Sequence, residues 1–183
     1  MQNVILITGA VTSGKTTFLS SLAEVLSLRW QVDGFLAKAP ERRHCSEQFS
    51  PGYVLYRLET EDTYPWATPK DRNSGYFFDQ DTQHFLDHGF ARQIAGKVVD
   101  ILFLDELGKL ELRGKGLDRV LQSAILSHPG WLVCAVKKRF FSEIVEKYRF
   151  QPVMCIDLDI TDSAPALEKI TRYFDAVPPK PAR

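Results

Sequence analysis

The sequence predicts an α/β fold, in which a mostly parallel sheet is covered by helices on both faces. Two observations support this prediction. First, the chain contains short apolar runs, and segments with helical spacing of apolar residues lie between most of them. Strands that alternate with helices in this way form parallel sheets. Second, the runs have the length of strands, and the first of them lacks polar alternation, which suits a strand buried on both faces. They occupy residues 3–8, 31–37, 98–104, 131–136 and 153–158.

Helices are expected at five places, and the first of them illustrates the pattern. Its apolar residues recur at intervals of three and four positions, which places them on one buried face. These residues are Phe18, Leu19, Leu22, Val25 and Leu26. The expected helices cover residues 15–28, 81–95, 116–127, 142–148 and about 164–174.

Residues 38–80 interrupt this alternation of strands and helices. They hold four prolines and an alternating apolar and polar pattern at 53–59. We therefore expect an inserted β-hairpin or meander there. The rest of residues 1–176 is expected to form one domain around it, because the chain of 183 residues is long enough for a single sizeable core. The proline-rich tail at 177–183 is expected to be disordered.

Charge and hydropathy exclude several classes of partner. The chain has 23 basic and 23 acidic residues, and the resulting formal charge of zero argues against capture of nucleic acid or of an anionic membrane. No apolar run approaches the length of a transmembrane helix, and the first residues do not resemble a signal peptide. Cys134 and Cys155 lie in apolar runs, as reduced core cysteines do. We expect a soluble cytoplasmic protein that is a monomer or a small oligomer.

A phosphate-binding loop follows the first expected strand. Residues 9–16 read GAVTSGKT and match the pattern G-x-x-x-x-G-K-[ST] at every fixed position. Glycines allow the backbone amides to approach phosphate oxygens, and the helix that follows adds its N-terminal amides. Lys15 can reach the β- and γ-phosphates, and the Thr16 hydroxyl can bind Mg²⁺. The expected nucleotide-binding residues are Gly9, Ala10, Val11, Thr12, Ser13, Gly14, Lys15, Thr16 and Thr17.

Three acids follow the strand expected at 98–104. Asp105 ends this strand, and ligands of open α/β sheets bind at the carboxyl edge where the phosphate loop also lies. Asp105 is therefore expected to hold Mg²⁺ together with Thr16, directly or through water. Glu106 is expected to orient and deprotonate the water that attacks the γ-phosphate. Glu111 stands among leucines, and a surface position or a salt bridge is expected for it.

Basic residues follow the strand at 131–136. Lys137, Lys138 and Arg139 reach the same carboxyl edge, where one cation could stabilise charge on the transferred phosphoryl group. Arg139 is favoured because of its planar guanidinium, and a solvated basic turn is the alternative. Residues 105–108 also match the D-x-x-G element of GTPases. The guanine-recognition pattern N-K-x-D is missing at 137–140, so that form of guanine specificity is unsupported.

Taken together, the segments GAVTSGKT (9–16), ILFLDELGKLEL (101–112) and LVCAVKKRF (132–140) resemble one family. This family comprises small P-loop nucleoside-triphosphatases from thermophiles and the human cancer-related nucleoside-triphosphatase. Its second motif, D-E-I/L-G-x-M/L-E-L, fits residues 105–112 throughout. The resemblance implies a RecA-like P-loop fold and Mg²⁺-dependent hydrolysis of ATP, GTP and other triphosphates. The family's R-x-G-F and N-R-D elements have no counterpart at 50–53 and 160–165, so no base preference follows.

The sequence thus predicts a Mg²⁺-dependent nucleoside-triphosphatase that acts on the β–γ bond of ATP or GTP. Glu106, Lys15 and Arg139 are its expected catalytic residues. A small-molecule or nucleotide kinase with the same loop is one alternative, for which Arg42 and Arg43 could supply a basic lid. A nucleotide-gated accessory protein that acts on a protein partner is the other.

Overall fold

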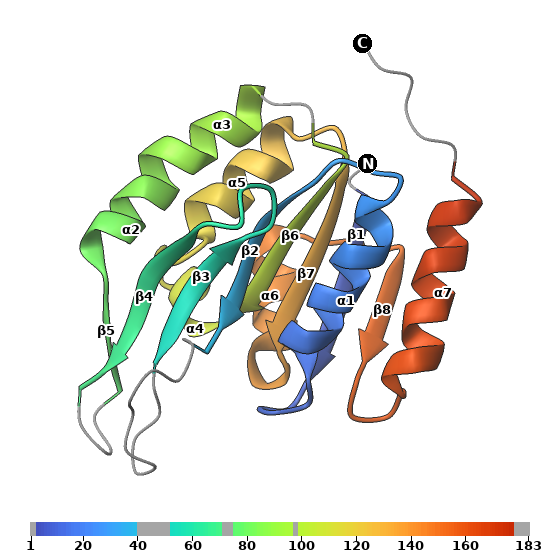
Figure 1. Cartoon of the computed structure of the whole chain (residues 1–183). Coiled ribbons are helices and arrows are strands. Elements are labelled where there is room, and N and C mark those ends of the chain that lie inside the picture. The colour runs from blue at the N-terminus through green and yellow to red at the C-terminus, as the bar shows by residue number, and fades with distance from the viewer. Residues whose placement is uncertain (1–2, 40–51, 71–74, 97–98, 178–183) are drawn as a thin grey trace.

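The computed structural model describes residues 3–39, 52–70, 75–96 and 99–177. Within these ranges eight strands form a single sheet in the order β5-β4-β3-β2-β6-β7-β1-β8 (Figure 1). The five strands from β2 to β8 in this order pair in parallel. They are β1 (Asn3–Gly9), β2 (Val32–Lys38), β6 (Ile101–Leu107), β7 (Trp131–Lys137) and β8 (Met154–Asp157).

Helices cover both faces of the sheet, which confirms the expected fold class (Figure 1). One face packs against α1 and α7, and the other against the helical run from α2 to α3 together with α5 and α6. The helices on the first face are α1 (Lys15–Ser27) and α7 (Ser163–Asp175). Those on the other are α2 (Gln80–His84), a π-helical segment (Phe85–Phe90), α3 (Ala91–Gly96), α4 (Lys109–Leu112), α5 (Asp118–Ser127), a 3₁₀ turn (Lys138–Phe140) and α6 (Phe141–Tyr148).

The inserted segment forms a meander that extends the sheet beyond β2. Its antiparallel strands are β3 (Tyr53–Arg57), β4 (Thr63–Pro69) and β5 (Tyr76–Phe78). A buried ion pair joins the meander to the parallel part, because Arg57 donates through Nε and Nη2 to the Asp33 carboxylate at 3.1 and 2.8 Å. Residues 40–51, which include Arg42 and Arg43, and the tail at 178–183 lie outside the described residues.

Two expectations about the strands need correction. The strand expected to end at residue 104 continues to Leu107, because a bulge between Leu104 and Leu107 keeps it paired with β7. Cys155, expected in the core, is exposed because β8 is short and lies at the edge of the sheet, whereas Cys134 in the central strand β7 is buried. No helix among the described residues is long and apolar enough to span a membrane.

Gly34 permits close pairing of β2 with β6, and its substitution tests this contact. The residue has φ of 122°, and a Cβ there would lie 1.9 Å from the Phe103 carbonyl oxygen. We expect Gly34→Ala to lower the free energy of unfolding by about 3 kcal/mol or more, because the strands must separate. Gly96→Ala is the matched control, since a Cβ there meets no atom within 4 Å. Equal urea midpoints for the two variants would contradict this account.

Candidate functional site

The loop between β1 and α1 has the geometry of a phosphate cradle. Gly14 takes a left-handed conformation, with φ of 84°, and α1 begins at the next residue. The Lys15 ammonium lies within the loop, where it donates to the carbonyls of Gly9 at 3.1 Å and Ala10 at 2.7 Å. The Lys15 side chain is 4% exposed, so a charge is held against the loop backbone and away from bulk water. Such a loop presents a cation and helix N-terminal amides to an anion.

Thr16 and Asp105 meet although 89 positions separate them in the chain. The Thr16 hydroxyl donates to Asp105 Oδ2 at 2.6 Å. The same oxygen accepts from the Ala37 amide at 3.1 Å, and Asp105 Oδ1 accepts from the Glu106 amide at 2.8 Å. The start of α1 and the ends of β2 and β6 therefore converge on one carboxylate, as expected for the ligand edge of a parallel sheet.

Burial dominates the electrostatics of Asp105. The residue is 2% exposed, and loss of solvent raises the pKa of its carboxyl to about 6. This value includes the neighbouring Glu106 charge, which also raises the pKa, and the hydrogen bonds from Thr16, Ala37 and Glu106, which lower it. A desolvated carboxylate beside a hydroxyl is a pair of hard oxygen ligands, which suits Mg²⁺.

Glu106 occupies the bulge of β6 in a left-handed conformation, with φ of 65°. This conformation is uncommon for a residue with a side chain, and it is tolerated where surrounding structure fixes it. The Glu106 carboxylate pairs with Lys137 at 2.8 Å, and their side chains are 31% and 36% exposed. The bulge therefore turns an acid out of the sheet beside the buried Asp105, where it can face a reacting group.

The three basic residues after β7 have different surroundings. Lys137 pairs with Glu106, and Lys138 pairs with Asp157 at 3.0 Å and Asp159 at 2.7 Å. Arg139 is exposed, and its guanidinium lies 4.6 Å from the centre of the Phe140 ring. The cation in contact with the expected general base is thus Lys137, while a catalytic role of Arg139 stays a prediction.

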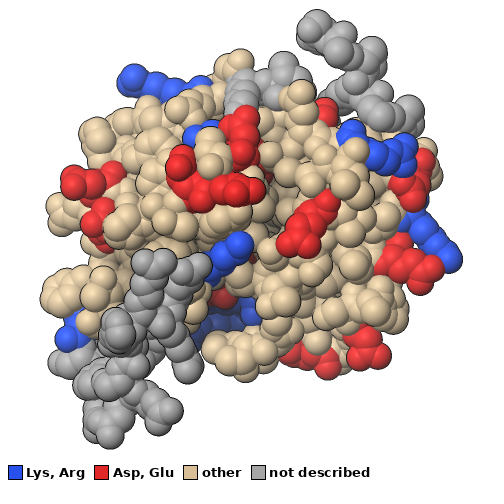
Figure 2. Space-filling view, viewed as in Figure 1, with Lys and Arg blue, Asp and Glu red and all other residues tan. Residues whose placement is uncertain are grey.

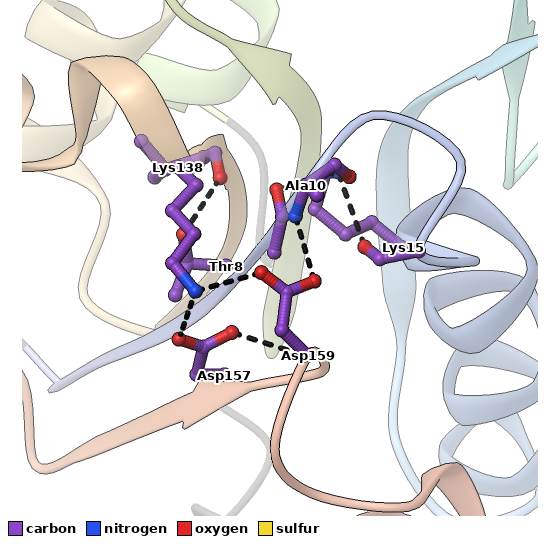
Figure 3. Close-up of polar contacts among 9 residues, drawn as sticks. Thr8, Ala10, Lys15, Lys138, Asp157 and Asp159 are labelled. Carbon is purple, nitrogen blue, oxygen red and sulfur yellow. Dashed lines mark hydrogen bonds and ion pairs between the residues drawn. The ribbon is translucent and has the colours of Figure 1, made fainter.

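Asp159 is a residue of the site that the motifs did not indicate. Its Oδ1 accepts from the Ala10 amide at 2.9 Å, and its Oδ2 accepts from Lys138 (Figure 3). Figure 3 shows Asp159 between the phosphate loop and the Lys138 side chain, with Asp157 beside it. The turn after β8 is therefore tied to the loop. Its position after a strand that ends at the carboxyl edge was the available sequence signal.

Glu111 has a different role from the one expected, because it is buried and not at the surface. The side chain is 3% exposed, and burial raises the pKa of its carboxyl. Its oxygens accept from the Gly108 amide at 2.7 Å and the Leu117 amide at 3.0 Å. These bonds close the turn around α4, directly after Glu106. Glu111 thus fixes the backbone that carries the expected general base.

A cavity of about 740 Å³ lies along the phosphate loop. Every loop residue expected to hold phosphate lines it except Ser13, whose hydroxyl lies 3.4 Å from the Lys15 ammonium. Val11 and Thr12 form the exposed tip of the loop. Glu106, Lys137, Lys138 and Arg139 line the opposite wall. The volume is within the range of small-molecule sites, which is about 300–1,000 Å³.

The raised pKa of Asp105 predicts a pH-dependent cost in stability. Its folded pKa of about 6 exceeds the usual value of 3.8, so its contribution to stability is largest below pH 4 and is lost as the pH rises through 6. Because Asn cannot ionise, we expect the effect of Asp105→Asn on the free energy of unfolding to be more favourable at pH 8 than below pH 4, by about 3 kcal/mol. This difference should fall to about half at pH 5.

Urea unfolding of the nucleotide-free protein at both pH values measures this effect. Asp62→Asn is the matched control, because Asp62 is exposed and should change stability by less than about 0.5 kcal/mol at either pH. An effect of Asp105→Asn that is the same at pH 5 and pH 8 would refute ionisation of the buried carboxyl as its cause.

Two solved structures share this fold. The first is THEP1 from the hyperthermophile Aquifex aeolicus, with 22% identity, a TM-score of 0.65, and coverage of 91% of this chain and 96% of that one. The second is a human cancer-related nucleoside triphosphatase, with 21% identity, a TM-score of 0.68, and coverage of 98% and 100%. A search of curated proteins found no match.

A family model described as NTPase matches residues 4–171. This match contains the phosphate loop, Asp105 and Glu106 of β6 and the basic residues after β7, and it spans every residue that lines the cavity. The resemblance drawn from the sequence motifs is thereby confirmed. The chain belongs to the NTPase family and is a nucleoside-triphosphatase.

Proposed function

We propose that this nucleoside-triphosphatase hydrolyses the β–γ bond of ATP and GTP with Mg²⁺ as cofactor. The observation that supports this most strongly is the 2.6 Å contact between Thr16 of the phosphate loop and Asp105 of β6. It brings a hydroxyl and a carboxylate together next to a loop that holds phosphates. Glu106 follows Asp105 directly and lines the cavity along this loop, so an acid is available beside a bound phosphate group.

The donor set fits a magnesium ion that binds together with phosphate. Mg²⁺ is usually held by one or two protein oxygens, substrate phosphates and water. Thr16 and Asp105 supply a hydroxyl and a carboxylate at the mouth of the loop. In the described part of the chain no group of three or more His, Cys, Asp or Glu residues forms a separate metal cage. When bound, Mg²⁺ would neutralise charge on the β- and γ-phosphates.

The residues of the chain then divide the chemistry among them. Amides of the loop and of the first turn of α1 hold the phosphate oxygens, and the Lys15 ammonium exchanges loop carbonyls for the β- and γ-phosphates. Glu106 accepts a hydrogen bond from water aimed at the γ-phosphorus and takes its proton. Lys137, paired with Glu106 at 2.8 Å, keeps that carboxylate in position. Guanine and adenine are both expected as bases, since the interactions named here contact only phosphate and water.

Replacement of Glu106 separates binding from turnover. We expect Glu106→Gln to reduce steady-state phosphate release from ATP about 100-fold or more, because the amide cannot accept the proton of water. Binding of a fluorescent ATP analogue should change by less than about threefold, since Glu106 does not hold the phosphates. The control is Glu146→Gln on the exposed face of α6, which should leave both measurements unchanged. Unchanged phosphate release by Glu106→Gln would exclude this residue as the base.

Replacement of Lys15 tests the phosphate loop itself. We expect Lys15→Ala to weaken binding of the same ATP analogue about tenfold or more, because a charge-assisted contact to phosphate is lost. Lys169→Ala removes an exposed lysine from α7 and serves as control. A fluorescence titration measures the dissociation constant of the ATP analogue for both variants. Wild-type affinity in Lys15→Ala would show that the nucleotide binds elsewhere.

A further inference from the structure

A second cavity of about 500 Å³ adjoins the nucleotide cavity. The two share five lining residues: Glu106, Lys137, Arg139, Tyr53 and Tyr76. No residue of the phosphate loop lines the second cavity, whereas Asp105 and Glu106 both do. It therefore begins at the acids, on the side where the mechanism proposed above places the terminal phosphate. The hydrolysis proposed above needs only a water molecule there, so this volume is unexplained.

One wall of the second cavity is aromatic and belongs to the inserted meander. Tyr53 and Tyr76 lie 5.7 Å apart between ring centres, and Trp66 and Phe78 lie 5.3 Å apart. Tyr76 and Phe78 join the two pairs at 6.4 Å. Tyr53 and Phe78 are 39% and 38% exposed, which is high for large apolar side chains inside a cavity. Such a wall suits a planar ring, since rings stack on aromatic faces.

The opposite side of the cavity carries an excess of positive charge. Lys109 and Arg113 line it from α4 and the turn after it, together with Arg139. Within the described ranges, none of these three side chains has an ion pair. The same cavity is also lined by the carboxylates of Asp105, Glu106 and Glu111 and by Lys137, which pairs with Glu106, so four cations face three acids. Arginine and lysine in this arrangement recognise a phosphate or carboxylate group.

From these observations we propose that the second cavity binds a nucleoside monophosphate as a phosphoryl acceptor. Its base would stack on the aromatic wall. Its phosphate would have Arg113 and Lys109 on one side and the terminal phosphate of the bound triphosphate on the other. A monophosphate fits better than a triphosphate, because this cavity has no phosphate loop of its own. The proposal rests on the proposed function, in that the donor triphosphate must occupy the phosphate loop.

The transfer step is balanced without any further reactant. An oxygen of the acceptor phosphate attacks the γ-phosphorus, and the bond from that phosphorus to the β–γ bridging oxygen breaks. The electron pair of the broken bond leaves with the nucleoside diphosphate, and the acceptor becomes a second diphosphate. An ionised phosphate needs no general base, so Glu106 is required for hydrolysis and not for transfer. Water and acceptor thus compete for the same phosphoryl group.

The first experiment supplies ATP labelled at the γ-phosphate, Mg²⁺, and one of AMP, GMP, CMP or UMP at 1 mM, about the upper end of common KM values. We expect labelled nucleoside diphosphate from at least one acceptor, with less labelled inorganic phosphate than in its absence. Release of labelled phosphate with no labelled diphosphate from any acceptor would overturn the proposal and leave the hydrolase function standing. If neither product forms, both proposals fail.

Arg113→Ala and Arg119→Ala form a matched pair for this assay. Both arginines are exposed, but only Arg113 lines the second cavity. We expect Arg113→Ala to raise the KM for the acceptor about tenfold and to leave ATP hydrolysis without acceptor unchanged. Arg119→Ala should change neither. Equal acceptor KM values for the two variants would contradict binding in this cavity.

Glu106→Gln supplies an independent readout of the same proposal. If the acceptor is a phosphate, this variant should keep transfer within about threefold of the wild type while its hydrolysis falls about 100-fold. Parallel loss of both activities would show that the acceptor oxygen needs deprotonation, and it would exclude a nucleoside monophosphate.

Discussion

The buried carboxylate of Asp105 is the constraint on which the rest of the site depends. It accepts hydrogen bonds from the Thr16 hydroxyl at the start of α1 and from the Ala37 amide at the end of β2. Desolvation opposes its ionisation and raises the pKa of the carboxyl to about 6. The fold therefore retains a charge that costs stability near neutral pH. Such a cost is common where a function requires the group, and a cation bound there would offset it.

Glu106 depends on a different part of the structure, although it is the next residue. Its left-handed conformation accompanies the bulge in β6. The backbone after it is held by the hydrogen bonds that the Gly108 and Leu117 amides donate to the Glu111 carboxylate. Lys147 of α6 donates a hydrogen bond to the Glu111 carbonyl and so connects this turn to α6. Asp105, the proposed metal ligand, and Glu106, the proposed general base, are thus adjacent in sequence but are held by different contacts. A change in the packing of α4 or α6 would displace Glu106 and leave Asp105 in place.

The sequence predicted the parallel sheet and the meeting of Thr16 with Asp105, because apolar runs and the carboxyl-edge rule depend on local pattern and on topology. It could not predict the burial of Glu111, since a buried carboxylate is identified by backbone amides that converge only after the α4 turn forms. Asp159 was missed for a related reason. Its partner is the Ala10 amide, 149 positions away, and no side-chain motif encodes a bond to a backbone group.

The meander is more than an extension of the sheet, because its attachment determines where its aromatic side chains stand. Arg57 of β3 binds the buried Asp33 of β2 through two nitrogens, and its guanidinium lies 4.9 Å from the centre of the Phe90 ring. The register of β3 on β2 is therefore fixed by a desolvated pair that tolerates little displacement. Tyr53 begins β3 and Trp66 lies in β4, which pairs with β3, so these two residues of the aromatic wall belong to the sheet and not to a loop. A ligand beside Glu106 would meet a preformed surface, which lowers the entropic cost of binding.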